Sequence, residues 1–356
     1  MIKVFQIGCG KMSKYAMRYV YEHGAEVVGA VDINESIIGS DIGEIMGSES
    51  KGVTISKLSD LKKELQKTKP NIAIIMTMSL LDDIKNEARI CLEEGVNVIT
   101  TCEEAFFASN SNPTLWKELD ILAKANNCTI TGCGYQDVFW GNLISVISGT
   151  THKITRIKGS SSYNVEDYGI ALAKAHGAGL TLEEFDEQVA SVDKISDEER
   201  QAIIESGKYT PSYMWNTVGW LADKLKLHIT STKQVCVPQT YEEDLESSTL
   251  NMTIKSGDAT GMSAVVTAET EEGIILEAEC IGKVYSKDEV DTNEWTVEGE
   301  PNTTITVKQP ATVELTCADI VNRLPDVINA RPGFVPTSQM PEPTYRTNAL
   351  DTYLTK

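Results

Sequence analysis

The sequence predicts an α/β fold in which a doubly wound parallel sheet comes first and an α+β substrate domain with a largely antiparallel sheet follows. Short apolar runs alternate with helical segments up to about residue 130, and strand-like segments without helices between them dominate from residue 247. Continuous apolar runs indicate strands buried on both faces, as in a parallel sheet that helices cover. Strands that follow one another directly favour antiparallel pairing.

Five buried strands and four helices are expected in the first domain. The apolar runs cover residues 4–7, 26–31, 72–76, 96–100 and 128–131. The segments with helical spacing of apolar side chains cover residues 11–23, 58–66, 81–94 and 116–125. Because strand and helix signals alternate, each strand is expected to cross over to a parallel neighbour, as in Rossmann-type folds.

The pattern changes after Gly134. Further helices are expected over residues 182–192, 197–206, 212–225 and 312–324, and strands over residues 153–162, 249–255, 263–269, 274–281 and 303–307. We therefore predict a nucleotide-binding domain over residues 1–134 and a substrate and dimerisation domain over residues 135–309. Residues 310–356 are predicted to return to the first domain.

Composition and charge limit the class of protein. The 356 residues are 41% hydrophobic and 24% charged, which is typical of a globular chain of roughly two domains. The formal net charge of −20 argues against nucleic acid as a partner, because phosphate binding requires a basic surface. No apolar run reaches the roughly 18–20 residues of a membrane span, so no membrane partner is expected.

Cysteine and histidine usage points to a reducing compartment and away from a metal site. None of the eight cysteines forms a C-x-x-C pair, and the four histidines are not spaced as a helical metal pair. The first residues form a strand pattern and not that of a signal peptide. We therefore expect reduced thiols, no metal and a cytoplasmic location.

A glycine-rich turn follows the first strand. Residues 8–13 read GCGKMS, a G-x-G-x-x-S pattern between strand and helix, which is where a dinucleotide fingerprint stands. Gly8 permits the tight turn, and Gly10 lets the pyrophosphate approach the helix N-terminus. Ser13 replaces the usual third glycine, and its hydroxyl is a candidate phosphate contact. The alternative is a tight strand–helix turn that binds no ligand.

Asp32 ends the second strand, where an acid in this fold binds the ribose hydroxyls. It would repel a 2′-phosphate, and no arginine follows closely, so NAD is expected as the preferred cofactor with NADP as the alternative. A helix-capping role is the other interpretation of Asp32. The residues expected to bind the cofactor are Gly8, Gly10, Lys11, Met12, Ser13, Asp32, Thr77, Ser79 and Thr101.

Two adjacent carboxylates, Glu103 and Glu104, follow the fourth strand at the edge that faces the expected cofactor crevice. Partial desolvation in a strand-end cleft would perturb their pKa values, which is a property of catalytic acids and bases. In an extended backbone the two side chains point to opposite sides, so only one would meet the substrate. The alternative is an acid pair at a helix N-terminus before Phe106.

Segments spread over the whole chain carry a family resemblance. They are GCGKMS, AVDINESIIGSDIGEIMG, GVNVITTCEEA, GCGYQDVFWGN and DIVNRLPDVINARPGF. With these segments the chain resembles the dihydrodipicolinate-reductase-like amine dehydrogenases. In sugar-oxidising relatives of this architecture the same strand end reads C-E-K-P with a catalytic lysine, and Glu104 stands at that lysine position here. The resemblance therefore implies amine oxidation, and with it a homodimer.

The implied reaction is oxidative deamination of a primary amine, with 2,4-diaminopentanoate as the expected substrate and 2-amino-4-oxopentanoate and ammonia as products. Glu104 is expected to be the general acid/base, with Glu103 as second choice, because a carboxylate attracts the substrate ammonium and stabilises the iminium product. A dihydrodipicolinate-reductase-type imine reductase, a sugar dehydrogenase and a non-catalytic NAD-binding protein remain as alternatives.

Candidate substrate contacts come from segments after the fifth strand. Asp137 is a candidate for the second amine of a diamino acid, and Arg331 in the late NARPG loop is a candidate for a carboxylate. The full expected set is Tyr135, Gln136, Asp137, Ser161, Asn164, His176 and Arg331. Structural alternatives include a helix cap for Asp137, a surface position for His176 and a helix-end cation for Arg331.

Overall fold

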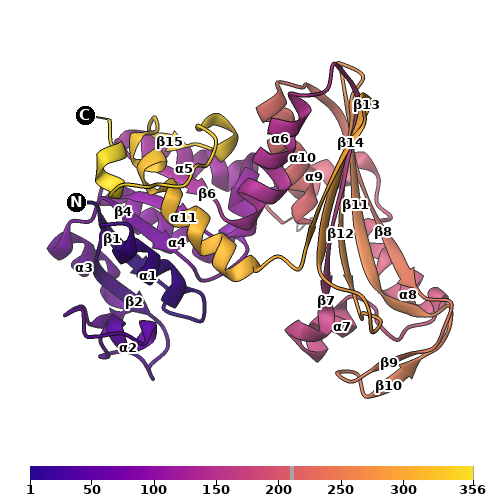
Figure 1. Ribbon diagram of the computed structural model, residues 1–356, viewed down its shortest axis with the longest axis horizontal. Coiled ribbons are helices and arrows are strands. Elements are labelled where there is room, and N and C mark those ends of the chain that lie inside the picture. The colour runs from indigo at the N-terminus through magenta and orange to yellow at the C-terminus, as the bar shows by residue number, and fades with distance from the viewer. Residues whose placement is uncertain (209–211, 356) are drawn as a thin grey trace. The chain divides into compact units, whose positions relative to one another are not determined.

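The computed structural model of the chain describes residues 1–208 and 212–355 (Figure 1). The chain divides into two compact units. Unit 1 comprises Met1–Asn142, Glu205–Gly207 and Ala311–Lys356. Unit 2 comprises Leu143–Ile204 and Lys208–Pro310. The C-terminal segment therefore belongs to the same unit as the N-terminal strands.

Unit 1 is built on a seven-stranded parallel sheet, which confirms the expected doubly wound class. The strands lie in the order β15-β6-β5-β4-β1-β2-β3, and neighbours run parallel. Their bounds are β1 (Lys3–Ile7), β2 (Glu26–Asp32), β3 (Ile55–Lys57), β4 (Ile72–Ile75), β5 (Asn97–Thr100), β6 (Thr129–Gly132) and β15 (Gly333–Phe334). The sequence does not predict β3 and β15, because strands this short show no periodicity.

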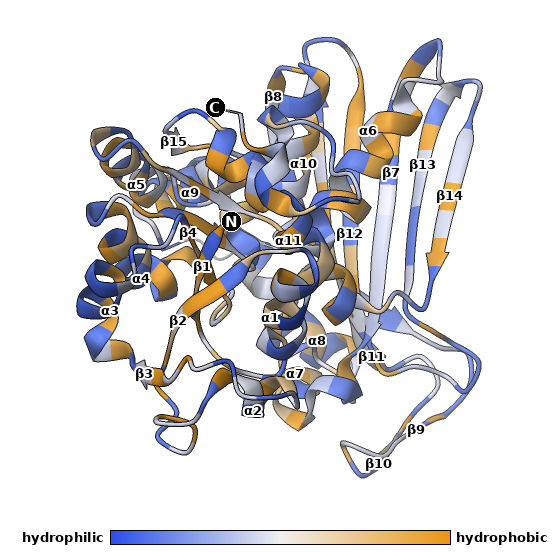
Figure 2. Ribbon diagram, turned by 60° about the vertical axis from the view of Figure 1, so that its left-hand side comes forward, coloured by the Kyte–Doolittle hydropathy of each residue, from blue (hydrophilic) through white to orange (hydrophobic). Residues whose placement is uncertain are grey.

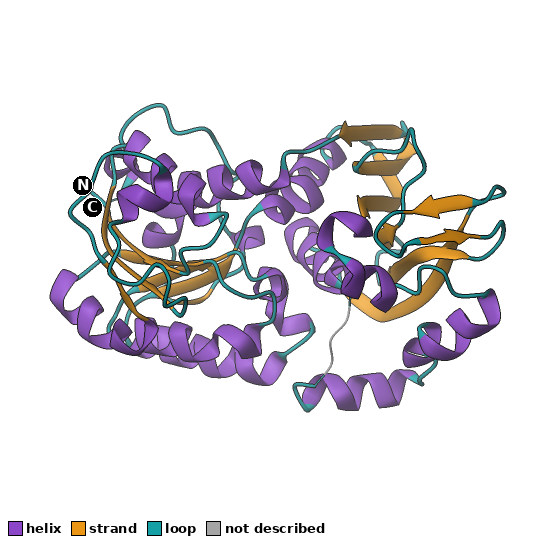
Figure 3. Cartoon of the chain, turned by 90° about the horizontal axis from the view of Figure 1, so that it is seen from below, coloured by secondary structure: helices purple, strands orange, loops and turns teal. Residues whose placement is uncertain are grey.

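Helices cover both faces of this sheet, and Figure 3 shows them above and below it. In β4, Ala73 and Ile75 pack into one core cluster, whereas Ile72 and Ile74 pack into the other together with Met17 of α1. Both faces of the strand are buried, which explains the continuous apolar runs of the sequence. The helices of unit 1 are α1 (Ser13–Glu22), α2 (Ile42–Met46), α3 (Leu61–Thr68), α4 (Leu81–Glu93), α5 (Pro113–Ala125) and α11 (Thr312–Asn329).

The first boundary between the units lies after Asn142 and not after Gly134 as predicted. The intervening segment ends in a π-helical turn, Asp137–Asn142, and Arg323 of α11 holds this turn inside unit 1. Arg323 Nε lies 2.8 Å from Asp137 Oδ2, and both side chains are fully buried. Because this ion pair ties the turn to the C-terminal helix, the segment stays with the first sheet.

The Asp137–Arg323 pair belongs to a buried polar cluster. Asn142 Nδ2 donates to Asp137 Oδ1 at 2.9 Å, and the Cys133 thiol lies 2.9 Å from Asp319 Oδ2. Burial, and after it the charge of Asp137, raises the pKa of Asp319 well above the usual carboxyl range, which favours its protonated form. Cys133, Asp137 and Asp319 bring metal-ligating atom types together, but Arg323 already neutralises Asp137. We therefore assign the cluster a structural role.

Unit 2 contains a six-stranded sheet in the order β14-β13-β7-β12-β11-β8. Neighbours are antiparallel except β7 and β12, which run parallel. The largely antiparallel second sheet is therefore confirmed, with one parallel pair, and β9 and β10 form a separate hairpin. The bounds are β7 (Lys153–Asn164), β8 (Ile229–Thr240), β9 (Leu245–Ser247), β10 (Met252–Ile254), β11 (Ala259–Thr270), β12 (Ile275–Lys283), β13 (Thr292–Glu300) and β14 (Thr303–Lys308).

The two faces of the six-stranded sheet differ. Helices α10 and α6 contact one face, where Val266 and Ala278 are fully buried, whereas Val235 and Val237 on β8 are 56% and 38% exposed. In Figure 2, β7, β13 and β14 are mostly white and blue. The helices of unit 2 are α6 (Leu143–Ser148), α7 (Ile170–Ala175), α8 (Leu182–Gln188), α9 (Asp197–Glu205) and α10 (Tyr213–Leu225). None of the described helices is both long enough and apolar enough to span a membrane.

Removal of the Arg323 guanidinium should destabilise unit 1 strongly. Arg323→Ala leaves the Asp137 carboxylate buried without its cation, which typically costs about 3–5 kcal/mol. Lys57→Ala is the matched control, because Lys57 pairs with Glu35 at 3.1 Å on the surface, where a pair contributes about 1 kcal/mol or less. Urea unfolding followed by circular dichroism measures both changes, and equal losses would contradict the role of the buried pair.

Candidate active site

Gly8 forms the turn between β1 and α1. Its φ is +85°, and a Cβ there would lie 2.6 Å from the carbonyl oxygen of Met76 and 2.6 Å from Thr77 Cγ2. The backbone N–H of Gly8 donates to the carbonyl of Val31 at 3.0 Å. The close approach of β4 and the left-handed backbone therefore both require glycine at this position.

Gly10 is exposed, and packing within the protein does not require a glycine at this position. A Cβ on Gly10 would meet no atom of the described residues within 4 Å. The space in front of Gly10 is therefore open to a ligand that approaches the backbone at the start of α1, as the pyrophosphate of a dinucleotide does. Lys11 is exposed beside this space, and Met12 is half-buried.

Ser13 takes the place of the third glycine of the fingerprint. Its side chain is almost fully buried, and its hydroxyl donates to the carbonyl of Gly10 at 2.8 Å. The hydroxyl is thus used to close the turn, and the structure does not support the direct phosphate contact that the sequence suggests for it.

The Asp32 carboxylate ties the glycine turn to the end of β2. Its Oδ2 accepts from the backbone N–H of Cys9 at 2.5 Å, and its Oδ1 accepts from the backbone N–H of Asn34 at 2.7 Å. Asp32 is half-buried, and the carboxyl end of β2 is where the ribose of a dinucleotide lies in this fold. The residues of this turn fit a nicotinamide dinucleotide.

The polar residues after β4 and β5 lie at the same edge of the sheet. Thr77 is exposed, and Ser79 and Thr101 are half-buried. The backbone N–H of Thr101 donates to the carbonyl of Ile75 at 3.1 Å, and that of Glu104 donates to the carbonyl of Ser79 at 3.1 Å. These bonds hold the two loops side by side.

Glu104 and Glu103 begin a 3₁₀ segment, Glu103–Asn110, that directly follows β5. Glu104 is 6% exposed; its Oε2 accepts from the backbone N–H of Leu81 at 2.7 Å, and its Oε1 accepts from the Ser111 hydroxyl at 3.0 Å. Leu81 is the first residue of α4, so the Glu104 carboxylate lies at the positive end of that helix. Glu103 is half-buried beside Ser79.

Burial raises the pKa of both glutamates above the usual value for this side chain. For Glu104 the Leu81 amide and the Ser111 hydroxyl oppose the rise, and the charges of Asp82 and Asp83 add to it. For Glu103 a hydrogen bond from Ser79 opposes it. A raised pKa brings a carboxyl group closer to the range in which it exchanges protons with a substrate.

The structure corrects the prediction for Asp137. Asp137 is fully buried and its carboxylate is bound by Arg323, so it is not available to a substrate amine. Its neighbours Tyr135 and Gln136 are also buried, at 7% and 6% exposure. The ring of Tyr135 stacks on Phe139 with centroids 4.6 Å apart, and Gln136 Nε2 donates to the carbonyl of Cys133 at 3.3 Å.

The structure also corrects the prediction for Arg331. Arg331 precedes β15, which pairs with β6 in parallel, so it lies toward the amino ends of the strands. Glu104 lies at their carboxyl ends. Arg331 is exposed, and its Nη2 donates to Gln339 Oε1 at 2.6 Å. It is therefore not placed to hold the carboxylate of a substrate at the cofactor edge.

The remaining candidate substrate residues lie in unit 2. His176 is half-buried, its Nε2 is 2.7 Å from the Tyr163 hydroxyl, and burial lowers its pKa, which favours the neutral ring. Asn164 ends β7 and accepts from the backbone N–H of Glu166 at 3.1 Å. Ser161 is half-buried on the same strand. Tyr163 is a contact that no sequence pattern indicates, because its partner is set by tertiary packing.

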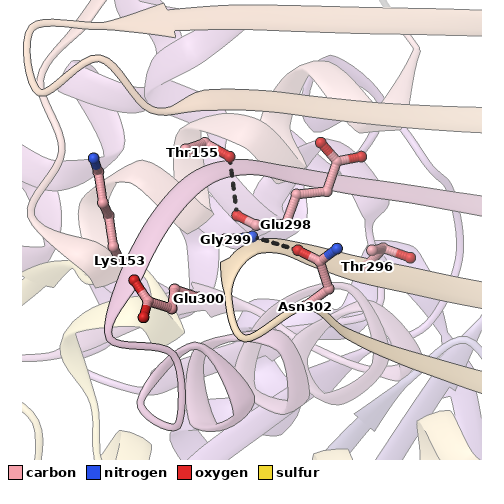
Figure 4. Close-up of a pocket in the computed structure, with 7 residues that line it drawn as sticks. All are labelled: Lys153, Thr155, Thr296, Glu298, Gly299, Glu300 and Asn302. Carbon is pink, nitrogen blue, oxygen red and sulfur yellow. Dashed lines mark hydrogen bonds between the residues drawn. The ribbon is translucent and has the colours of Figure 1, made fainter.

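The hollow drawn in Figure 4 lies in unit 2 at the turn between β13 and β14. Its lining residues are Lys153, Thr155, Thr296, Glu298, Gly299, Glu300 and Asn302. The Thr155 hydroxyl donates to the carbonyl of Glu298 at 3.2 Å, and the backbone N–H of Gly299 donates to Asn302 Oδ1 at 2.7 Å. These bonds stabilise the turn, so we place no catalytic chemistry there.

An open glycine turn held by an acid at the end of β2 suits a nicotinamide dinucleotide, and this places the chain among the dehydrogenases that use one. Comparisons with known proteins narrow the class. Residues 139–356 match the family model of the 2,4-diaminopentanoate dehydrogenase C-terminal domain, and residues 2–104 match that of the dihydrodipicolinate reductase N-terminus. The chain belongs to the 2,4-diaminopentanoate dehydrogenase family, and it is an oxidoreductase of the amine dehydrogenase class.

Individual relatives agree with this membership. A 2,4-diaminopentanoate dehydrogenase of Acetoanaerobium sticklandii is 23% identical over 96% of this chain and 94% of its own. The solved amine dehydrogenase of Mycobacterium smegmatis is 36% identical, with a TM-score of 0.79 and 98% of each chain covered. A probable dehydrogenase from Thermotoga maritima, at 10% identity and a TM-score of 0.57 over 93% of this chain and 90% of its own, shares the fold.

Alanine at the two glycines should separate folding from cofactor binding. Gly10→Ala is expected to leave Tm unchanged and to raise the Kd for NADH by about tenfold or more, because the Cβ occupies ligand space and touches no protein atom. Gly8→Ala is expected to lower Tm, because its φ of +85° and the contact with Met76 strain the turn. Thermal melts and NADH fluorescence titrations measure these effects, and an unchanged Kd in Gly10→Ala would contradict the assignment of the cofactor site.

Proposed function

We propose that the chain catalyses the NAD-dependent oxidative deamination of a primary amine, with 2,4-diaminopentanoate as substrate and 2-amino-4-oxopentanoate and ammonia as products. The observation that carries the proposal is the carboxylate pair Glu103 and Glu104 at the carboxyl end of β5. The relative that bears the name of this activity aligns over nearly the whole chain, which supports the choice of substrate.

The residues of the glycine turn would hold the cofactor, with Gly8 and Gly10 under the pyrophosphate and Asp32 at the ribose. When bound, the nicotinamide accepts hydride from the carbon that carries the amine. The chain itself must bind the amine, take up its proton and stabilise the cation that forms.

The substrate ammonium must lose a proton before hydride can leave, because the nitrogen lone pair forms the new C=N bond. With an amine pKa near 10, this costs about 4 kcal/mol at neutral pH. We assign the proton acceptor to Glu104, which Leu81 and Ser111 hold in one orientation and whose raised pKa narrows the gap to the donor. Water then adds to the iminium carbon and ammonia leaves, so that amine, NAD⁺ and water become ketone, ammonia, NADH and a proton.

Glu103 would act beside Glu104 as the second carboxylate. It is less buried, and its charge attracts the substrate ammonium and stabilises the cationic iminium. This acidic environment also separates the proposal from a reductase of imino dicarboxylates, whose substrate would require cations in place of the two glutamates.

The cofactor preference should depend on Asp32. We propose NAD over NADP, because the Asp32 carboxylate would repel a 2′-phosphate. Asp32→Ser is expected to raise the ratio of kcat/KM with NADP to kcat/KM with NAD by about tenfold or more, which corresponds to about 1.4 kcal/mol. Glu35→Gln is the control, because it removes an exposed charge three residues away and should leave the ratio unchanged. An unchanged ratio in Asp32→Ser would contradict the proposed role of Asp32 in the preference for NAD.

Glutamine at the two glutamates tests the chemistry. Glu104→Gln is expected to lower kcat for deamination by about 10²–10⁴-fold, whereas Glu103→Gln should act mainly by raising KM. In the unmodified enzyme, deamination needs ionised Glu104, so kcat should fall as the pH is lowered through its raised pKa, above the usual value near 4.3. Stopped-flow recording of NADH formation across pH measures both effects.

Circular dichroism of each glutamine variant serves as the folding control for this experiment. Full activity of a folded Glu104→Gln would overturn the proton acceptor, and loss of turnover in Glu103→Gln alone would move the role to Glu103. A panel in which every amine fails and a hydroxy substrate reacts would overturn the proposed substrate class.

We also propose that the enzyme is a homodimer. The face of the six-stranded sheet that carries Val235 and Val237 continues across Val265 of β11, and the exposed Ile275 of β12 lies along the same face. A second copy of this face would bury those apolar side chains in the isologous manner of common two-fold dimers.

A further inference from the structure

Unit 1 contains a pocket of about 240 Å³ that lies beside the edge strand β15. Three segments that are distant in the sequence form its walls: the 3₁₀ segment after β5, helix α5, and the residues around β15. The lining residues are Ala105, Phe107, Ala108, Ser109, Trp116, Asp120, Lys124, Arg331, Phe334, Pro336 and Gln339. The glycine turn follows β1, four strand positions away in the sheet, which is about 19 Å at the usual strand spacing. The pocket is therefore separate from the cofactor turn.

The charges of the pocket leave one cation available. Lys124 Nζ is bound by Asp120 Oδ2 at 2.6 Å, and Asp120 Oδ1 accepts from the backbone N–H of Phe334 at 3.0 Å. The Lys124–Asp120 pair is thus occupied in holding β15. Arg331 is exposed, donates to the neutral amide of Gln339, and is paired with no carboxylate among the described residues.

Apart from Ser109, the other residues of the pocket wall are apolar or aromatic. Phe107 and Trp116 are half-buried, and Phe334, Ala105 and Ala108 are buried. The Arg331 guanidinium can bind a carboxylate through two parallel N–H groups. The apolar wall beside it suits a carboxylate that carries an apolar body. Because the net charge of −20 disfavours the approach of anions, apolar contact would add to what the Arg331 guanidinium alone contributes to binding a carboxylate.

The pocket shares a wall with the segment that carries the two glutamates. The backbone of Phe107 leaves the helical region, with φ −150° and ψ 59°, and so kinks the 3₁₀ segment at the pocket. Ser111 at its far end donates to Glu104 Oε1. The near end is fixed, since a Cβ on Gly132 of β6 would lie 2.3 Å from the Ala105 carbonyl carbon. Because the Ala105 end is packed against β6, we expect a displacement of Phe107 to reach Ser111 more readily than the sheet.

We propose that this pocket is a regulatory site for a small monocarboxylate with an apolar or aromatic body, held by Arg331 against Trp116 and Phe107. Its occupancy acts on the Ser111–Glu104 hydrogen bond through the kinked segment, and this second step rests on the proposed role of Glu104. Ser111 is in these terms a positioning residue for the Glu104 carboxylate.

Binding is tested first, without reference to activity. Benzoate and hexanoate are titrated at constant ionic strength while tryptophan fluorescence is recorded, with benzamide as the uncharged control. The expected result is a saturable change with both carboxylates that is absent with benzamide and lost in Trp116→Phe. The Kd should rise about tenfold or more in Arg331→Gln and less in Arg331→Lys, which retains the charge. A change of equal size with benzamide or in Arg331→Gln, or no saturable change with either carboxylate, would overturn the site.

The effect on the reaction is tested second. Benzoate is expected to change kcat for deamination in the unmodified enzyme and to leave Arg331→Gln unaffected, whereas competition at the active site would raise KM equally in both proteins. Saturable binding with unchanged kcat would overturn the coupling to Glu104. If Glu104→Gln proves fully active while benzoate still binds at Arg331, the proposed acid/base role fails and the pocket stands.

Discussion

The parallel direction of the strands in unit 1 is the constraint on which the proposed active site depends. The carboxyl ends of parallel strands meet at one edge, so Gly8 after β1, Asp32 at the end of β2, Ser79 after β4 and Glu104 after β5 come to the same edge. The backbone reinforces this arrangement, since the N–H of Glu104 donates to the carbonyl of Ser79. In an antiparallel sheet, successive strand ends would lie at opposite edges and the same residues would be scattered.

The sequence predicts those parts of the structure whose geometry is set locally, within one strand or one βαβ unit. Gly8 and Asp32 can be placed because a single βαβ unit fixes their spacing, and the strand cores can be placed because both faces are apolar. Asp137 could not be recognised as a structural anion, because its partner Arg323 is 186 residues away. The position of Arg331 toward the amino ends of the strands cannot be predicted from the sequence, because β15 has only two residues, too few to show a strand pattern.

The proposed chemistry uses a carboxylate whose burial is balanced by fixed hydrogen bonds. The Leu81 amide and the Ser111 hydroxyl compensate part of the cost of desolvating Glu104. The part of the desolvation cost that these hydrogen bonds do not offset raises the pKa of Glu104. A carboxylate with a raised pKa is a stronger base toward the substrate ammonium. Asp137 differs from Glu104 in its partner, because its fully buried carboxylate is paired with the Arg323 guanidinium and is not available to a substrate.

The Asp137–Arg323 pair also has a consequence for the order in which the polypeptide matures during translation. A ribosome that adds about 5–20 residues per second needs roughly 10–40 s to progress from one partner to the other, and all of unit 2 is made in that interval. Until α11 emerges, the carboxylate of Asp137 has no cation with which to enter the interior. The core of unit 1 around this turn is therefore completed only after α11, which follows unit 2 in the sequence, has been synthesised.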